Sequence, residues 1–224
     1  MVSQLLWVIF PYLCIFSFII GHIFRFRYDQ FNWTAKSSEF IEKKTLKYGS
    51  LMFHIGIVPV FLGHVVGLGV PKEWTRALGI SDHLYHLGAA FGGGFFGIIT
   101  LIGMILLTYR RLSVKAVRKL SSVSDIIVNL LLLFIVFIGV YATFFTTIAV
   151  PDFDYRETIS VWFRGLLVFS PDAVFMNTVP LSFQLHVLTG FLIIGLWPYT
   201  RLVHVWSVPV NYVGRSYIIY RKHR

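Results

Sequence analysis

The stretch Leu51–Val70, LMFHIGIVPVFLGHVVGLGV, is an apolar run of 20 residues that carries two histidines, His54 and His64. A helix of this length crosses the hydrocarbon core of a bilayer, which is about 30 Å thick. A polar ring inside hydrocarbon costs free energy unless something binds it, so a histidine within a span is a candidate functional residue. This run therefore predicts a membrane-spanning helix with two candidate ligands.

A second apolar run repeats the pattern near the C-terminal end of the sequence. It extends from Pro180 to Val208 and contains His186 and His204. For a single histidine, a hydrogen bond to a neighbouring helix is the simpler interpretation. Four histidines on two spans are the number needed for two irons with two imidazole ligands each, and this count favours haem.

The composition is that of an integral membrane protein. Of 224 residues, 56% are hydrophobic and only 13% are charged, and the mean hydropathy is +0.73, outside the usual range for a soluble domain. The single cysteine, Cys14, excludes an intrachain disulfide, a CxxCH haem attachment and a cysteine-bound iron–sulfur cluster. The net charge of +10 follows from membrane topology, so we expect no nucleic-acid partner.

Five apolar runs are long enough to cross a membrane as helices. They predict an all-α fold, with residues 1–224 forming one integral membrane bundle and a short cytoplasmic C-terminal tail. The expected spans are residues 5–24, 48–70, 87–109, 126–150 and 180–203.

The connections between these runs predict the orientation. The first connection, the third connection and the C-terminal tail hold six, five and five Lys or Arg residues. The other side holds only Lys72, Arg76, Arg156 and Arg164. Because cytoplasmic loops carry an excess of Lys and Arg, we expect the N-terminus outside and the C-terminus in the cytoplasm.

The helical rise places the histidines at two depths. At 1.5 Å per residue, His54 and His64 lie about 15 Å apart along their axis. The second and fifth spans are antiparallel, so His64 is expected to pair with His186 near the outer face. His54 then pairs with His204 near the inner face, and one haem lies in each half of the bilayer. Iron with two imidazole ligands has no open site, so such haems transfer electrons.

If both helices were straight, the axial distance between the two histidines would differ between the second and the fifth span. Eighteen residues of helix would separate His186 and His204 by about 27 Å. Kinks at Pro59 and Pro198 are expected to absorb the difference.

Three further features allow predictions, and the first two have two interpretations each. Phe91–Gly97, FGGGFFG, predicts either close helix contact or room for a flat cofactor or quinone ring. Haem propionates need cationic partners, and Arg110, Arg111 and Arg201 are candidates that the orientation rule explains equally well. Val161–Phe169 predicts an amphipathic segment on the outer surface.

A group of polar residues lies where the outer connection enters the third span, beside the expected outer haem. It contains His83, Tyr85 and His86, next to Asp82. Oxidation of a quinol needs a proton acceptor near an electron acceptor, and histidine titrates in the appropriate range. These residues are candidates for a catalytic quinol site; the alternative is an ordinary polar loop end.

Several stretches carry a resemblance to a known family: FHIGIVPVFLGH (53–64), LTYRRL (107–112), LHVLTG (185–190), RLVHVWSVPVNY (201–212) and RYDQFNWTAKSS (27–38). They resemble the gamma subunit, the quinol-oxidising cytochrome b subunit, of membrane-bound respiratory nitrate reductase. The resemblance implies five helices and two haems b in the cell membrane. It implies that His54 and His204 hold the inner haem, and that His64 and His186 hold the outer haem beside the quinol site.

The resemblance also implies an activity and partners. Quinol, which we expect to be menaquinol, is oxidised near the outer face and its protons are released outside. Electrons pass to a cytoplasmic iron–sulfur (beta) subunit and then to a molybdenum-containing catalytic (alpha) subunit that reduces nitrate. Some family members have lysine at the start of the third span, where this sequence has Tyr85 and Leu87, so His83, Tyr85 or His86 is expected to substitute.

Two other functions are compatible with five spans. One is the cytochrome b membrane anchor of another oxidoreductase, such as a hydrogenase or a formate dehydrogenase, against which the RLVHVWSVPV stretch argues. The other is a haem-free membrane anchor or transporter.

Overall fold

The structure is a computed structural model that describes residues 1–29, 40–150 and 153–206. Within these residues every regular element is a helix, which confirms the all-α prediction. Five of the described helices are long and apolar enough to cross a membrane, as predicted. They span Val2–Tyr28, Lys44–Gly69, Asp82–Ser113, Val123–Thr146 and Leu181–Tyr199. The expected C-terminal tail lies outside the described residues.

Each span is built from one main helix. These are α2 (Phe10–Tyr28), α3 (Lys44–Gly69), α5 (Asp82–Ser113), α7 (Val123–Tyr141) and α10 (Leu181–Leu196). The first span begins with α1 (Val2–Gln4) and the π-helical turn η1 (Leu5–Ile9), and the fourth continues into the π-helical turn η3 (Ala142–Thr146). The short connecting elements are α4 (Lys72–Ala77), α6 (Lys115–Leu120), α8 (Thr147–Ala149), α9 (Ile159–Leu167) and η4 (Ala173–Met176).

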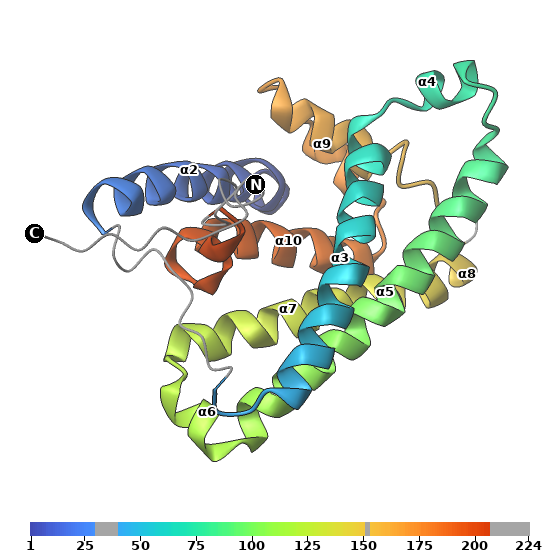
Figure 1. The fold of residues 1–224 in the computed structure, drawn as a ribbon. Coiled ribbons are helices and arrows are strands. Elements are labelled where there is room, and N and C mark those ends of the chain that lie inside the picture. The colour runs from blue at the N-terminus through green and yellow to red at the C-terminus, as the bar shows by residue number, and fades with distance from the viewer. Residues whose placement is uncertain (30–39, 151–152, 207–224) are drawn as a thin grey trace, which may run out of the picture.

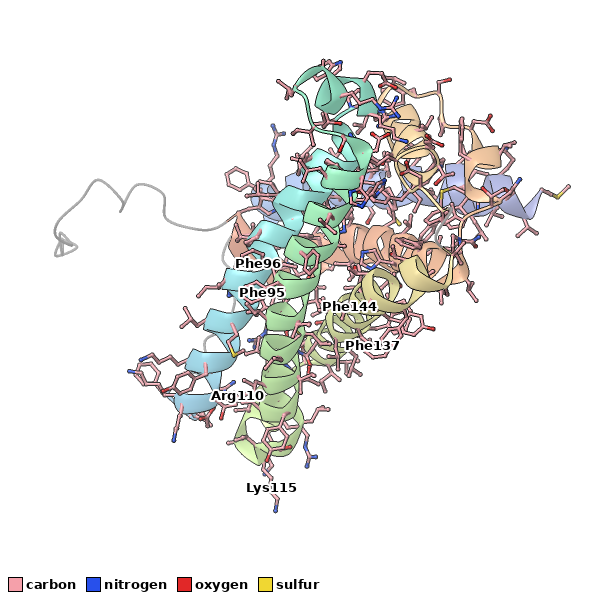
Figure 2. The ribbon with its side chains drawn as sticks, turned by 90° about the vertical axis from the view of Figure 1, so that its right-hand side faces the viewer. Phe95, Phe96, Arg110, Lys115, Phe137 and Phe144 are labelled. Atoms are coloured by element: carbon pink, nitrogen blue, oxygen red, sulfur yellow. The ribbon has the colours of Figure 1, made fainter. Side chains whose placement is uncertain are left out.

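The main helices form a row of neighbours (Figure 1). Helix α3 lies along α5, α5 contacts α7, α7 contacts α10, and α10 contacts α2. We call the two ends of the α3–α5 pair the α4 end and the α6 end, after the short helices that follow α3 and α5. Figure 2 shows α3 and α5 side by side, with Arg110 and Lys115 toward the α6 end.

Small residues bring α3 and α5 into close contact. A Cβ on Gly56 would lie 2.7 Å from both the Phe96 carbonyl oxygen and the Thr100 amide nitrogen. A Cβ on Gly103 would lie 2.9 Å from the Gly49 carbonyl oxygen. In lipid, where apolar surface gains little from leaving the solvent, such backbone contact is a main source of helix association.

The glycines of Phe91–Gly97 divide between the two interpretations. A Cβ built on Gly94 would meet the Phe144 ring of η3, and one built on Gly97 would lie 3.2 Å from a methyl group of Val140, so close helix contact is confirmed for these two. No atom lies within 4 Å of a Cβ built on Gly92 or Gly93. Room for a flat group remains the prediction at those positions.

The fifth span is not the single helix that was predicted over residues 180–203. Helix α10 ends at Leu196 and is followed by two 3₁₀ turns, η5 (Trp197–Tyr199) and η6 (Arg201–Val205). Between them Thr200 is extended, with φ −123° and ψ 178°. Pro198 cannot donate a helical hydrogen bond and its ring obstructs the preceding turn, which explains the break. Pro59, by contrast, lies inside a continuous α3.

Helix α9 corrects a second prediction, since Val161–Phe169 is not simply a surface segment. Trp162 is 1% exposed and its ring packs edge-on against Trp7 and Phe191. The Trp162 indole N–H donates to the Trp7 carbonyl oxygen at 2.7 Å. Only the end of the segment, including Phe169, is exposed. Helix α9 therefore fastens the connection between the fourth and fifth spans to the first span.

The α3–α5 contact gives a test of the packing. We expect Gly103→Val to lower the free energy of unfolding by about 1–3 kcal/mol, because its Cβ would displace the α3 backbone. Gly88→Val is the matched control on the same helix, since no atom lies within 4 Å of a Cβ there. Thermal unfolding in detergent measures both. Equal stability of the two variants would contradict a close α3–α5 contact.

Candidate functional site

The structure brings the four histidines of the spans together as two pairs. At the α4 end, the rings of His64 on α3 and His186 on α10 have centroids 5.8 Å apart and planes 24° apart. At the α6 end, the rings of His54 on α3 and His204 on η6 have centroids 6.3 Å apart and planes 75° apart. The pairs are therefore those expected from antiparallel spans, one toward each end of α3.

In each of these histidines, ring nitrogen Nδ1 is bonded to a backbone carbonyl oxygen. For His54 and His64 the acceptor lies one turn earlier on α3, at 2.7 Å in both cases. For His186 the acceptor is Ile135 of α7 at 3.1 Å, and for His204 it is Arg201 at 2.6 Å. A carbonyl oxygen only accepts, so Nδ1 carries the hydrogen and Nε2 carries the lone pair. This is the arrangement that prepares an imidazole to bind a metal.

The distances fit a metal bound between the two rings of each pair. An imidazole nitrogen binds a transition metal at about 2 Å, which places two opposed ring centroids roughly 6 Å apart. In the described part of the chain, no group of three or more His, Cys, Asp or Glu side chains could hold a metal ion. Two opposed imidazoles with no third protein ligand suit an iron whose remaining ligands come from a flat macrocycle. The residues present therefore fit haem.

The arginines at the α6 end have different partners. Arg110 donates to the Glu42 carboxylate at 2.8 Å, and Arg201 donates to the Asp125 carboxylate at 2.6 Å. Arg111 donates from Nη1 to the Ser121 hydroxyl at 2.9 Å. Its buried Nε has no hydrogen-bond partner among the described residues. Of the three candidates for an acidic group of a cofactor, Arg111 is thus the one with a buried donor to spare.

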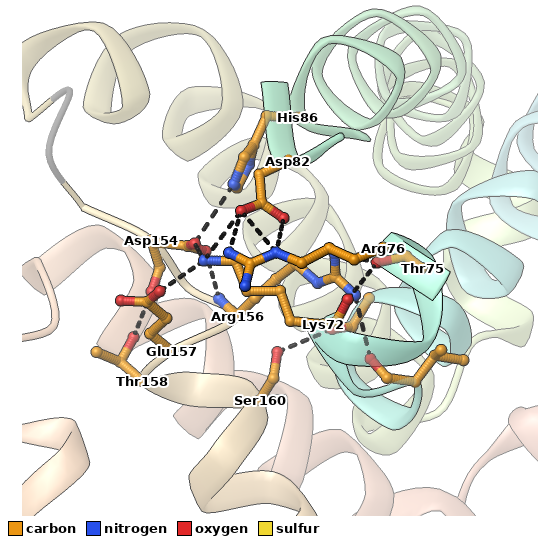
Figure 3. Close-up of polar contacts among 12 residues, drawn as sticks. Lys72, Thr75, Arg76, Asp82, His86, Asp154, Arg156, Glu157, Thr158 and Ser160 are labelled. Carbon is orange, nitrogen blue, oxygen red and sulfur yellow. Dashed lines mark hydrogen bonds and ion pairs between the residues drawn. The ribbon is translucent and has the colours of Figure 1, made fainter. Parts of the chain in front are cut away.

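A network of charged residues lies at the α4 end (Figure 3). The Lys72 ammonium of α4 lies 2.6 Å from both the Asp154 and the Glu157 carboxylates. His86, at the start of α5, approaches the same Asp154 oxygen with its Nε2 at 3.5 Å. The network therefore joins α4, α5 and the connection before α9.

Two tyrosines connect this network to the nearer histidine pair. A Cβ built on Gly67, three residues after His64, would lie 3.2 and 3.3 Å from the Tyr155 and Tyr85 hydroxyl oxygens. The Arg156 guanidinium lies 3.9 Å from the centre of the Tyr85 ring. Both hydroxyls thus lie within one helical turn of a predicted ligand.

The three residues predicted for a quinol site have different positions. Tyr85 and His86 belong to the network, whereas His83 is exposed. Lys72, Asp154 and Arg156 also belong to it. No sequence pattern selects these three residues; they differ from their neighbours only in carrying charge. Their contacts join residues more than 80 positions apart, which local pattern does not reveal.

The network shifts the pKa values of its members. Burial raises the pKa of the Asp154 carboxyl, but bonds from Lys72 and from the Arg156 amide, with nearby His86, outweigh burial and lower it below its usual value. Burial lowers the pKa of Lys72, but bonds to Asp154 and Glu157 outweigh it and raise that pKa. Burial, and the bond to Tyr85, raise the pKa of Tyr155, so its hydroxyl keeps its hydrogen.

Comparison with known proteins identifies related chains over nearly the full length. The family described as "Nitrate reductase gamma subunit" matches residues 3–223. The nitrate reductase gamma chain of Bacillus subtilis (strain 168) is 50% identical over 222 residues, covering 99% of each chain. The respiratory nitrate reductase 2 gamma chain of Escherichia coli (strain K12) is 36% identical over 217 residues, covering 96% of this chain and 95% of that one.

A longer relative contains the same region. The nitrate reductase-like protein NarX of Mycobacterium tuberculosis is 42% identical over 222 residues, which cover 99% of this chain and 34% of that protein.

The Lys72 bonds predict a stability effect with a defined pH range. We expect Lys72→Met to lower the free energy of unfolding by about 1.5–3 kcal/mol, the size of a hydrogen bond to a charged group. The Asp154 contribution is present above the ordinary carboxyl pKa, about 4, and is lost as pH falls through its lowered value. The Lys72 contribution is present below the ordinary ammonium pKa, about 10.4, and is lost as pH rises through its raised value.

The deficit in melting temperature of Lys72→Met relative to the parent should therefore shrink below about pH 4 and above about pH 10. Arg76→Met is the control, because the Arg76 side chain is 55% exposed and its ion pair contributes little. Equal losses in both variants, or a deficit that persists undiminished at both extremes of pH, would contradict the assignment.

Proposed function

The chain belongs to the nitrate reductase gamma subunit family, and from this premise we propose that it is a quinol-oxidising cytochrome b with two haems. Membership in this family, with five candidate spans, makes it a multi-pass cell-membrane subunit of a nitrate reductase complex. The substrate is menaquinol or another quinol, oxidised near the outer face with release of protons outside. The partners are an iron–sulfur (beta) subunit and a molybdenum-containing (alpha) subunit in the cytoplasm, where nitrate is reduced.

The observation that supports this proposal most directly is the pairing of the four histidines. Two pairs of rings lie at centroid distances of 5.8 and 6.3 Å. In both pairs every Nδ1 is bonded to a carbonyl oxygen, so every Nε2 has its lone pair. A histidine that only joined two helices would use its ring nitrogens for the partner helix. His54 and His64 instead bond within α3, whereas His186 bonds to α7 through Nδ1 and keeps Nε2 for a ligand.

The proposed orientation places the α6 end in the cytoplasm and the α4 end outside. The α6 end carries α6, with the sequence KAVRKL, and the arginines after Tyr109, whereas the α4 end carries the acidic connection with Asp154 and Glu157. Basic segments stay in the cytoplasm during insertion. In this orientation His54 and His204 form the inner pair, and His64 and His186 form the outer pair.

The roles of the residues follow from this arrangement. When bound, two haems b supply the one-electron carriers that lead the two electrons of a quinol from the outer side to the iron–sulfur subunit. His64 and His186 would hold the outer haem, and His54 and His204 the inner one. Arg111 is placed to bind an acidic group of the inner haem through its spare Nε. Tyr85 and His86 would bind the quinol head group beside the outer pair.

The assignment of the outer haem can be tested by removing one ligand. We expect His64→Ala to bind one haem b per chain, where the parent chain binds two, because iron held by a single imidazole loses half of its protein ligation. Quinol-driven nitrate reduction by the complex should be lost, whereas nitrate reduction with reduced viologen, which supplies electrons to the soluble subunits, should remain. Haem is counted from the reduced-minus-oxidised optical spectrum of purified protein.

His83→Ala is the matched control, since His83 is exposed and at the same end of the bundle. It should keep two haems. A parent chain without a b-type spectrum would refute the proposal and favour a haem-free anchor. Two haems and full quinol activity in His64→Ala would refute the assignment of the outer pair.

A further inference from the structure

We infer that Asp154 is the positioning residue that makes His86 the proton acceptor for the quinol, so that the His86–Asp154 pair carries a quinol proton to the outer aqueous phase. This inference rests on the proposed function and extends it to Asp154, which belongs to no recognisable sequence motif.

The contact between the two side chains carries the inference. His86 Nε2 lies 3.5 Å from Asp154 Oδ2. A carboxylate beside an imidazole orients the ring and stabilises the imidazolium that forms when the ring accepts a proton. The Asp154 carboxylate is itself fixed, since its Oδ1 accepts from the Arg156 amide at 2.8 Å and its Oδ2 from Lys72 at 2.6 Å. Asp154 is thus an oriented anion that faces one titratable ring.

The pair lies between the proposed quinol position and water. The His86 ring packs edge-on against Tyr155 at 5.9 Å, and the Tyr155 hydroxyl lies over Gly67, one turn from His64. One tyrosine therefore separates His86 from the outer histidine pair. On the other side, the His86 side chain is 38% exposed, whereas that of Asp154 is 19% exposed. A proton on His86 consequently has direct access to solvent.

Other charges surround the imidazole from three elements. The cations are Lys72 and Arg76 of α4 and Arg156 of the connection before α9. The other anions are Asp82 of α5 and Glu157 of the same connection, and the hydroxyls are those of Tyr85 and Tyr155. The three cations are balanced by three carboxylates, of which Asp154 is the one in contact with the imidazole that accepts the proton.

The chemical step balances as follows. A quinol hydroxyl O–H bond breaks and an N–H bond forms on His86, while the two electrons of the quinol leave to one-electron acceptors of the haem class. The N–H bond then breaks and the proton passes to water outside. Both quinol hydroxyls lose their protons in this way or directly to water, and the product is the quinone.

The experiment uses the whole complex with menadiol as the quinol probe. We expect Asp154→Asn to lower the menadiol-driven kcat about tenfold or more, within the range of general acid–base effects. The acid limb of its pH profile should move to lower pH, because the imidazolium has lost the anion that stabilises it. His86→Gln should remove that limb, and Asp154→Glu should restore part of the rate. Haem content and viologen-driven nitrate reduction should equal those of the parent.

Glu157→Gln is the matched control. Glu157 binds the same Lys72 ammonium at the same distance of 2.6 Å, but its contact is with the lysine and not with His86. It should retain the parent rate and pH profile. Both variants remove one Lys72 bond, but Glu157 is 65% exposed and Asp154 is 19% exposed. Haem content and viologen-driven activity therefore serve to recognise a structural effect of Asp154→Asn.

Each remaining outcome is decisive. A parent complex that fails to oxidise menadiol overturns the proposed function, and this inference with it. If the parent is active, a parent-like pH profile in Asp154→Asn overturns the inference alone. An equal loss at every pH, or a parallel loss of haem or of viologen-driven activity, also overturns it, because those results describe a structural role.

Discussion

The constant rise of an α-helix is the constraint on which the two histidine pairs depend. Ten residues of α3 separate its two histidines by about 15 Å, whereas eighteen residues of helix would separate the other two by about 27 Å. The chain resolves this mismatch by ending α10 at Leu196, about 15 Å beyond His186. The 3₁₀ turns that follow keep His204 at the level of His54. Pro198 is therefore a requirement of the site as well as of the fold.

The broken end of α10 is held in place by charge. Asp125 caps α7 through the capping box with Ser122, and its other oxygen accepts from Arg201 at 2.6 Å. Arg201 in turn provides the carbonyl oxygen that orients the His204 ring. One carboxylate thus links the beginning of α7 to the orientation of a candidate ligand. In a segment without regular helix, this connection replaces the support that the helix backbone gives to the α3 histidines.

The sequence was sufficient for the features that depend on local composition. Hydropathy located all five spans of the described chain, and helical rise with antiparallel order gave the histidine partners. The sequence was insufficient where contacts between distant segments determine the structure. The burial of Trp162 and the bonds of Lys72 with Asp154 both depend on tertiary contacts. At the proposed quinol site, the pattern therefore suggested Tyr85 and His86 but also the exposed His83, and it gave no means to separate them.

The contacts of the first span have a consequence for how the chain is made. Its Trp7 carbonyl bonds to a tryptophan 155 positions later, and the Ser17 hydroxyl bonds to the Gly195 carbonyl 178 positions later. Residues of α9 and α10 must therefore be present before the first described span has its permanent neighbours. Until they have been synthesised, the Trp7 carbonyl and the Ser17 hydroxyl lack these partners. Closure of the bundle thus waits for the fifth span.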